Sequence, residues 1–295
     1  AYSGLWEIMV DFKPDVILFH GAAAYEINTV GKYIKKFPNV KFYVDSHEDY
    51  LNSARGFFSK NILYKMLYKT VLQRNLKYVE SVFYITKETS VFLKEVYKIP
   101  ENKLRFLPLG GEVPSTEERE KFRRNLRDEL GIDDNHILCI HSGKLDAFKR
   151  TGDILESFSK VKRDDLRLII IGSIDKSFEP VMESYLTRDK RIKFLGWKKA
   201  YELKQYLMAS DLYIQFRGQS ATMQQSVCNG SIVAVYPYES HLDLLKDSCF
   251  YIKEKEDLIT LFGTITIDKL HSKRNMNQEI INLLDYNKIS RFYEN

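Results

Sequence analysis

The regular alternation of short apolar runs with helical patterns constrains the fold of this chain most strongly. Runs rich in Val, Ile, Phe and Tyr, which are typical of strands, lie at 15–20, 40–45, 81–86 and 103–107. Helical patterns lie at about 23–36, 57–78 and 87–98. This strand–helix order predicts a parallel sheet covered by helices on both faces. No apolar run approaches the roughly 20 residues needed to span a bilayer.

The same order restarts after a linker. We assign to this linker the segment 108–116, which holds a Gly-Gly pair and two prolines, together with a charged run, Glu117–Arg127. Further strands are predicted at 137–141, 167–171, 192–195, 212–215, 231–236 and 249–252. Further helices are predicted at 151–162, 178–186, 200–209, 220–229 and 255–262, with a helical region near 275–292. The pattern predicts an α/β protein made of two Rossmann-like domains.

We place the first domain at 1–113, the second at 114–280 and a C-terminal helix, which could return to the first domain, at 281–295. The chain does not begin with Met, and its first strand is already of the parallel-sheet type, so we expect the first domain to be incomplete at its N-terminus. Three widely spaced cysteines lie in apolar segments (Cys139, Cys228 and Cys249) and predict reduced core thiols of a cytoplasmic protein.

One helical segment of the first domain is strongly basic. Arg55–Lys77 contains six basic residues and no acid, interleaved with apolar residues. The pattern fits a core helix with a solvated basic face, and it also fits a surface that contacts anionic lipid on the inner face of a membrane. Nucleic acid is not an expected partner, because the net charge of +5 is modest and no recognition motif accompanies it.

A basic turn opens the second domain. The apolar run 137–140 leads into Gly143, and Lys144, Lys149 and Arg150 precede a helical pattern. A strand that feeds a glycine turn, basic residues and a helix N-terminus suits an anion, because backbone N–H groups and the helix dipole attract negative charge. Taken alone, the same residues also fit a solvated loop.

A polar loop follows the predicted strand at 212–215. Ser220 is a plausible N-cap for the next helix, and Gly230 is a favourable residue just after its end. The hydrogen-bonding side chains around this helix start exceed what capping requires, and they are Gln219, Ser220, Thr222, Gln224 and Gln225. We interpret this loop as a second candidate ligand contact.

These motifs, in this order, resemble those of retaining GT-B glycosyltransferases of family 4. Gly143-Lys-Leu-Asp-Ala-Phe-Lys149-Arg150 is similar to the family's Gly-Arg-Leu-x-x-x-Lys-Gly turn. Phe194-Leu-Gly196-Trp197 and Ser210-Asp211 match a Phe-Leu-Gly segment and an Ala-Asp strand. Gln225-Ser-Val-Cys-Asn-Gly230 is similar to the Glu-Ala-Met-Ala-Cys-Gly segment. The resemblance covers about residues 15–260 and is strongest over 137–237.

The resemblance implies roles for individual residues. Lys144 and Lys149 would bind the donor diphosphate, with Arg150 as a further cation and Gly143 allowing close approach of the backbone. The nucleotide and sugar would contact Gly196, Trp197, Gln219, Ser220, Thr222 and Gln224. His47, in the segment Asp45–Asp49 after a strand, and Gln225 would act in catalysis, with a weaker expectation for His20. Neither a metal nor a cofactor is expected, and the nucleoside-diphosphate sugar is a co-substrate.

The implied activity is hexosyl transfer from a nucleotide sugar to a glycan or lipid-linked acceptor, as in cell-envelope polysaccharide synthesis. One departure bears on it: the family has Glu where this chain has Gln225, and Gln cannot supply negative charge to a cationic transition state. Two alternatives stay open. One is a non-catalytic nucleotide-sugar-binding partner of an active transferase, which the Gln225 replacement favours. The other is a nucleotide-sugar epimerase, because that class shares the double-Rossmann architecture.

Overall fold

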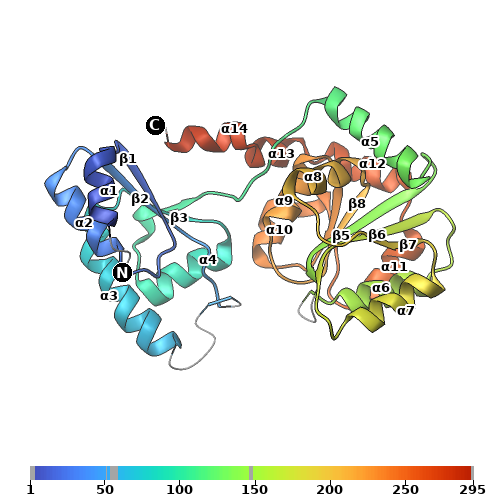
Figure 1. The fold of residues 1–295 in the computed structure, drawn as a ribbon, viewed down its shortest axis with the longest axis horizontal. Helices are drawn as coiled ribbons and strands as arrows, with labels where there is room; N and C mark the ends of the chain where they lie inside the picture. The colour runs from blue at the N-terminus through green and yellow to red at the C-terminus, as the bar shows by residue number, and fades with distance from the viewer. Residues whose placement is uncertain (1–3, 51, 54–58, 146–148, 294–295) are drawn as a thin grey trace. The chain divides into compact units, whose positions relative to one another are not determined.

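The computed structural model describes residues 4–50, 52–53, 59–145 and 149–293. The chain divides into two compact units between Pro108 and Leu109 (Figure 1). The sequence pattern places this boundary at 113, slightly further along the chain. Residues 281–293, which the pattern treats as a separate helix, belong to the second unit. In the described part of the chain no helix is long and apolar enough to cross a membrane.

The first unit is built on a parallel sheet in the order β1-β2-β3-β4. Its strands are β1 Val16–His20, β2 Lys41–Ser46, β3 Ser81–Tyr84 and β4 Leu104–Phe106. The helical elements are α1 Leu5–Phe12, α2 Ile27–Lys36, η1 Ser59–Tyr68, α3 Lys69–Asn75, η2 Leu76–Tyr78, α4 Lys87–Phe92, η3 Leu93–Tyr97 and η4 Glu101–Lys103. All four predicted strands are confirmed, whereas α1 was not predicted.

The second unit contains a six-stranded parallel sheet in the order β10-β9-β8-β5-β6-β7. Its strands are β5 Ile137–Leu145, β6 Leu166–Ile174, β7 Ile192–Phe194, β8 Leu212–Gln215, β9 Ile232–Val235 and β10 Phe250–Tyr251. Counted within the unit, this is the Rossmann order 3-2-1-4-5-6, in which the direction of winding reverses between β5 and β8. Ligands of such sheets bind at the carboxyl ends of the strands beside that reversal.

Helices cover both faces of this second sheet. The helices of the unit are α5 Thr116–Leu130, α6 Thr151–Lys160, α7 Glu179–Arg188, α8 Ala200–Ala209, α9 Ala221–Cys228, α10 Glu239–Leu245, α11 Lys255–Thr264, α12 Ile267–Asn275, α13 Gln278–Leu284 and α14 Tyr286–Ile289, with short 3₁₀ turns η5 Lys246–Ser248 and η6 Ser290–Tyr293. Figure 1 shows α6, α7 and α11 on one side and α8, α9 and α10 on the other, consistent with two separate apolar clusters.

The apolar run of β5 shows why this sheet is parallel and buried. Ile137 and Cys139 point into one cluster, and Leu138 and Ile140 point into the other. A strand whose side chains are apolar on both faces is stable only when helices cover both faces. The prediction of core thiols is also confirmed, because all three cysteines are buried and free.

One predicted feature of the second unit is wrong. The charged run Glu117–Arg127 is not part of a linker but lies within the helix α5. Ser115 caps this helix by accepting a hydrogen bond from the Glu118 backbone N–H at 3.1 Å, and Gly131 ends it with a positive φ of 68°. Both are ordinary helix-terminus signals, so the sequence did contain the information.

Candidate functional site

Three glycines expose the backbone at the carboxyl edge of the second sheet. Gly143 and Gly172 are paired across β5 and β6, and the Gly172 N–H donates to the carbonyl of Gly196 after β7 at 2.9 Å. A Cβ on Gly172 would lie 1.8 Å from the Gly143 carbonyl oxygen, and the φ of Gly172 is +149°. Only glycine fits there, because a side chain would force the two strands apart.

The basic turn divides into three different environments. The Lys149 side chain passes over Gly143, with its Cε 3.9 Å from where a Gly143 Cβ would be. Lys144 is exposed and lines a groove of about 550 Å³ that also contains the acids Asp153, Glu156 and Asp175. Residues 146–148, which belong to the same predicted turn and lie between Lys144 and Lys149, are outside the described residues. Lys149 is therefore a predicted cation whose side chain lies over the glycine edge.

Arg150 is engaged within the protein. Its Nε donates to Asp153 Oδ2 at 2.5 Å, and its Nη1 lies 3.7 Å from Glu254 Oε2. Its guanidinium also stacks on the Phe216 ring, 4.0 Å from the centroid. These contacts anchor the N-terminus of α6, where Arg150 itself has a left-handed backbone with a φ of 54°. A diphosphate would have to share this guanidinium with two carboxylates.

His141 is a buried residue of this edge that the sequence reasoning missed. Its Nδ1 lies 2.8 Å from the Ile214 carbonyl oxygen and its Nε2 lies 3.0 Å from Thr151 Oγ1. The ring therefore links β5, β8 and the start of α6 at the point where the winding reverses. Burial, together with repulsion from Lys149, lowers the pKa of His141 from 6.5 to about 4, so the ring is neutral at pH 7.

The polar loop after β8 is fixed largely by its own side chains. Gln215 is buried; its amide donates to the Gly218 carbonyl and its Oε1 accepts from the Ser220 hydroxyl, both at 2.5 Å. Ser220 also caps α9, as predicted, by accepting from the Met223 N–H at 3.4 Å. Gln219 donates to Ser240 Oγ at 3.0 Å. The loop is thus held by hydrogen bonds of its own side chains, and Gln215 is a further residue that sequence reasoning did not single out.

Gln224 and Gln225 hold the segment that enters the second unit. Gln224 is buried, and its Oε1 accepts from the Gly110 N–H at 2.6 Å. Gln225 Oε1 accepts from the Glu112 N–H at 3.0 Å, and its Nε2 donates to the Glu112 carbonyl at 2.8 Å. Both amides therefore recognise backbone at 110–112. Contact with a sugar would require these bonds to be exchanged.

Two predicted residues remain open to solvent at the same edge. Trp197, just after Gly196, is 68% exposed, which leaves its ring face accessible for stacking. Thr222 is partly exposed in the first turn of α9. An exposed tryptophan beside bare backbone is a plausible surface for a flat heterocyclic ring.

The first unit has its own polar edge at the ends of β1 and β2. His20 Nδ1 lies 2.9 Å from Asp45 Oδ2, and His47 Nε2 lies 3.7 Å from the same oxygen. The Gly21 N–H donates to Asp45 Oδ1 at 3.0 Å. Burial raises the pKa of Asp45, but the interactions with His47, His20 and the Gly21 N–H outweigh it and leave the pKa lowered. Asp45 is thus a carboxylate that orients two imidazoles.

This group suits proton transfer, and its ligand set would also suit a divalent metal ion. The candidate ligand atoms of His20, Asp45 and His47 all lie within 4.8 Å of one another. Glu48 lies in the same segment, and sequence reasoning does not single it out. Burial, despite hydrogen bonds from Ser46 and Tyr97, raises the pKa of Glu48.

Comparison with known proteins rests on structure. No family model matches the chain, and no curated protein is significantly similar in sequence. Anabaena HepE in complex with UDP matches with a TM-score of 0.72 at 15% identity, covering 98% of this chain and 80% of HepE. A glycosyltransferase from Rickettsia africae ESF-5 matches with a TM-score of 0.70 at 17% identity, covering 98% and 78%.

A third match points the same way. The E. coli trehalose-6-phosphate protein bound with UDP-2-fluoro glucose matches with a TM-score of 0.71 at 13% identity, covering 98% of this chain and 75% of its own. These matches extend over both parallel sheets. The chain has the GT-B fold. In GT-B terms, the expectation of two Rossmann-like domains is confirmed, and the glycine edge belongs to the second of them.

Proposed function

We propose that this GT-B protein is a glycosyltransferase that takes a sugar from a nucleoside-diphosphate donor and passes it to a hydroxyl acceptor. The observation that carries the proposal is the carboxyl edge of the second sheet, where Gly143, Gly172 and Gly196 bare the backbone beside Lys149 and the exposed Trp197. Uridine is the base we expect, since HepE and the E. coli protein were solved with uridine nucleotides.

The residues at this edge would act on the leaving diphosphate. Lys149 and the N-terminal N–H groups of α6 would stabilise negative charge as it grows there, because positive charge and oriented dipoles act strongly in a site with little water. His141, neutral and hydrogen-bonded on both sides, would keep the start of α6 in place. Lys144 and Arg150 would add to this positive charge, and Arg150 would share its guanidinium with Asp153.

On the acceptor side we assign acid–base chemistry to His47, oriented by Asp45 and His20. An imidazole can move a proton near neutral pH, which suits activation of a hydroxyl. Retention of configuration, a hexosyl donor and a glycan or lipid-linked acceptor of the cell envelope are finer parts of this proposal. They rest on the resemblance to retaining family 4.

Binding of UDP tests the donor edge directly. Lys149→Ala is expected to weaken UDP binding about tenfold to a hundredfold, because it removes one charge-assisted contact to phosphate. Lys190→Ala is the matched control, since Lys190 is exposed and lies just before β7, at the opposite edge of the same sheet. Isothermal calorimetry gives both dissociation constants. Equal binding by the two variants would argue against this edge as the diphosphate site.

A non-catalytic partner of an active transferase remains a second candidate, and Gln225 favours it. Both ends of its amide bind Glu112, so the position occupied by Glu in the resembling family serves as a clamp in this chain. Donor hydrolysis separates the two candidates. Turnover of a UDP-sugar that His47→Ala abolishes would support the enzyme, whereas UDP binding without any turnover would support the partner.

We also propose that η1 contacts anionic membrane. Ile62, Leu63, Met66 and Leu67 are each more than two-fifths exposed and recur at helical spacing, while Lys65 beside them is exposed. Apolar residues flanked by lysine are the composition of helices that lie in a membrane interface. Arg55, also predicted for this surface, lies outside the described residues.

Vesicle flotation tests this contact. The protein is expected to float with vesicles that contain phosphatidylserine and less with purely zwitterionic ones. Met66→Asp should reduce flotation, because it places a like charge among anionic head groups. Ile8→Asp in α1, an apolar residue that is equally exposed, is the control. If both variants float like the wild type, η1 is not the contact.

A further inference from the structure

Two arginines share one acceptor at the amino edge of the second sheet. Arg119 of α5 donates from Nη2 to the Gly230 carbonyl oxygen at 3.4 Å, and Arg274 near the end of α12 donates from Nε to the same oxygen at 2.8 Å. Both side chains are partly buried. A Cβ on Gly230 would lie 2.4 Å from Arg119 Cζ, so the guanidinium packs directly on this residue.

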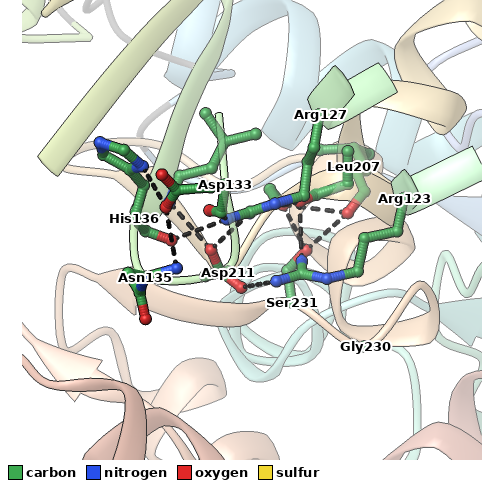
Figure 2. A network of polar contacts seen from close by, with 12 residues as sticks. Arg123, Arg127, Asp133, Asn135, His136, Leu207, Asp211, Gly230 and Ser231 are labelled. Carbon is green, nitrogen blue, oxygen red and sulfur yellow. Dashed lines mark hydrogen bonds and ion pairs between the residues drawn. The ribbon is translucent and has the colours of Figure 1, made fainter. Parts of the chain in front are cut away.

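The nearby carboxylate of Asp211 is already paired with two other arginines, Arg123 and Arg127. Asp211 accepts from Arg123 at 2.7 Å, from Arg127 at 3.0 Å and from the Leu138 N–H at 2.8 Å, as Figure 2 shows for the two arginines. Within the described residues, neither Arg119 nor Arg274 has a carboxylate partner within ion-pair distance. Burial, and then repulsion from Arg274 and Arg123, lowers the pKa of Arg119 to about 10.

The helix α9, which ends just before Gly230, does not neutralise the positive charges of Arg119 and Arg274. Gly230 follows α9, and a helix C-terminus carries roughly half a negative charge. Two full positive charges converge on it. The other acids nearby, Glu120 and Asp134, are exposed and form no ion pair with either arginine among the described residues. Partly buried positive charge without a partner is unfavourable unless an anion binds.

A cavity of about 230 Å³ lies where such an anion could bind. Its lining includes Arg123 and Arg274, the imidazoles of His136 and His271, and the acids Asp134 and Asp211, with two apolar residues of α12. The guanidinium group of arginine can donate two parallel N–H hydrogen bonds to phosphate oxygens. Arginine is for this reason widely used in phosphate recognition. The volume accommodates one phosphate group with a small substituent.

We propose that this cavity is a second anion site, which binds a phosphate group mainly through Arg274, with Arg123, already paired with Asp211, beside it. It is separate from the donor edge, because Leu138 at the start of β5 and Lys144 near its end are six residues apart, about 20 Å along a strand. The ligand is inorganic phosphate or a small phosphate monoester. The proposal does not depend on the proposed transferase function.

Urea unfolding of the full chain, with and without inorganic phosphate at constant ionic strength in chloride, tests the site. Phosphate is expected to raise the unfolding midpoint of the wild type by mass action. Arg274→Gln should weaken phosphate binding about tenfold or more, whereas Arg124→Gln, on the exposed side of α5, should not. Glycerol 3-phosphate is the monoester probe. Tighter binding of glycerol 3-phosphate than of inorganic phosphate would identify a phosphate monoester as the ligand, and the reverse would identify inorganic phosphate.

Two further variants keep the test decisive. Lys149→Ala should retain the phosphate effect while losing UDP affinity, so failure of the donor edge and failure of this site can be told apart. The phosphate effect of each variant is measured relative to its own midpoint in chloride, because Arg274→Gln also removes a hydrogen bond to Gly230 and the attraction to Asp211. If Arg274→Gln keeps the full phosphate effect, the second anion site is overturned. Arg274→Met repeats the measurement with an uncharged side chain of different chemistry.

Discussion

We expect His141 to make the second unit acid-labile. The ring is fully buried, and its tautomer follows from its contacts: Nδ1–H donates to the Ile214 carbonyl, so Nε2 accepts from the Thr151 hydroxyl. A proton on Nε2 would turn that acceptor into a donor inside a site that also holds Lys149. Burial and the Lys149 charge accordingly lower the pKa from 6.5 to about 4.

The magnitude follows from linkage between protonation and folding. Between about pH 6.5 and 4 the unfolded chain binds a proton on His141 and the folded chain does not. The stabilising contribution is therefore complete above pH 6.5 and is lost as the pH falls toward 4. At about 1.4 kcal/mol per pH unit, the total is about 3 kcal/mol, a large part of a typical domain's stability.

The assay is urea unfolding at several pH values in this window. In a Trp6→Phe background, Trp197 fluorescence reports the second unit alone. The free energy of unfolding should fall with decreasing pH by about 1.4 kcal/mol per pH unit more in this protein than in a His141→Gln variant. Titration of the carboxylates changes the free energy of unfolding equally in the parent and in His141→Gln, so it cancels in the difference between their slopes. His271→Gln controls for loss of one histidine, and identical slopes for His141→Gln and its parent would refute the reasoning.

Two other predictions concern residues with close partners. Asp211→Ala should destabilise the second unit by about 3–5 kcal/mol, because it leaves the buried Arg127 without its carboxylate, whereas Asp134→Ala should change stability little; equal urea midpoints for the two variants would contradict this. Gly172→Ala should lower both the unfolding midpoint and UDP affinity, because its Cβ would meet backbone at 1.8 Å. Gly263→Ala, in a helix with open space around the new Cβ, should be neutral or slightly stabilising, and a Gly172→Ala variant that behaves the same way would count against the strand-contact argument.

Strand positions could be predicted well because apolar runs report burial locally. Every predicted strand is present, and β5 and β6 are longer than their apolar runs because both continue through polar residues to the glycine edge. α5 was missed for a physical reason. Its inward face carries Arg119, Arg123 and Arg127 at intervals of four, where a helix normally presents apolar residues.

The candidate site could be predicted in outline only. The sequence indicated an anion site at the basic turn and a polar loop after β8, and both lie at the carboxyl edge of one sheet. It did not indicate His141 or Gln215, whose partners hold the edge together. It also treated all polar side chains of a motif as available for ligand.

By itself the sequence determined the α/β alternation, the two sheets and the reduced cysteines, because these depend on residues close together in the chain. Only the tertiary structure decided which polar groups are already in use. Gln224 meets Gly110, and Arg127 meets Asp211, across long stretches of chain. A hydrogen bond or ion pair needs both partners within about 3 Å, and only the folded chain brings such residues together.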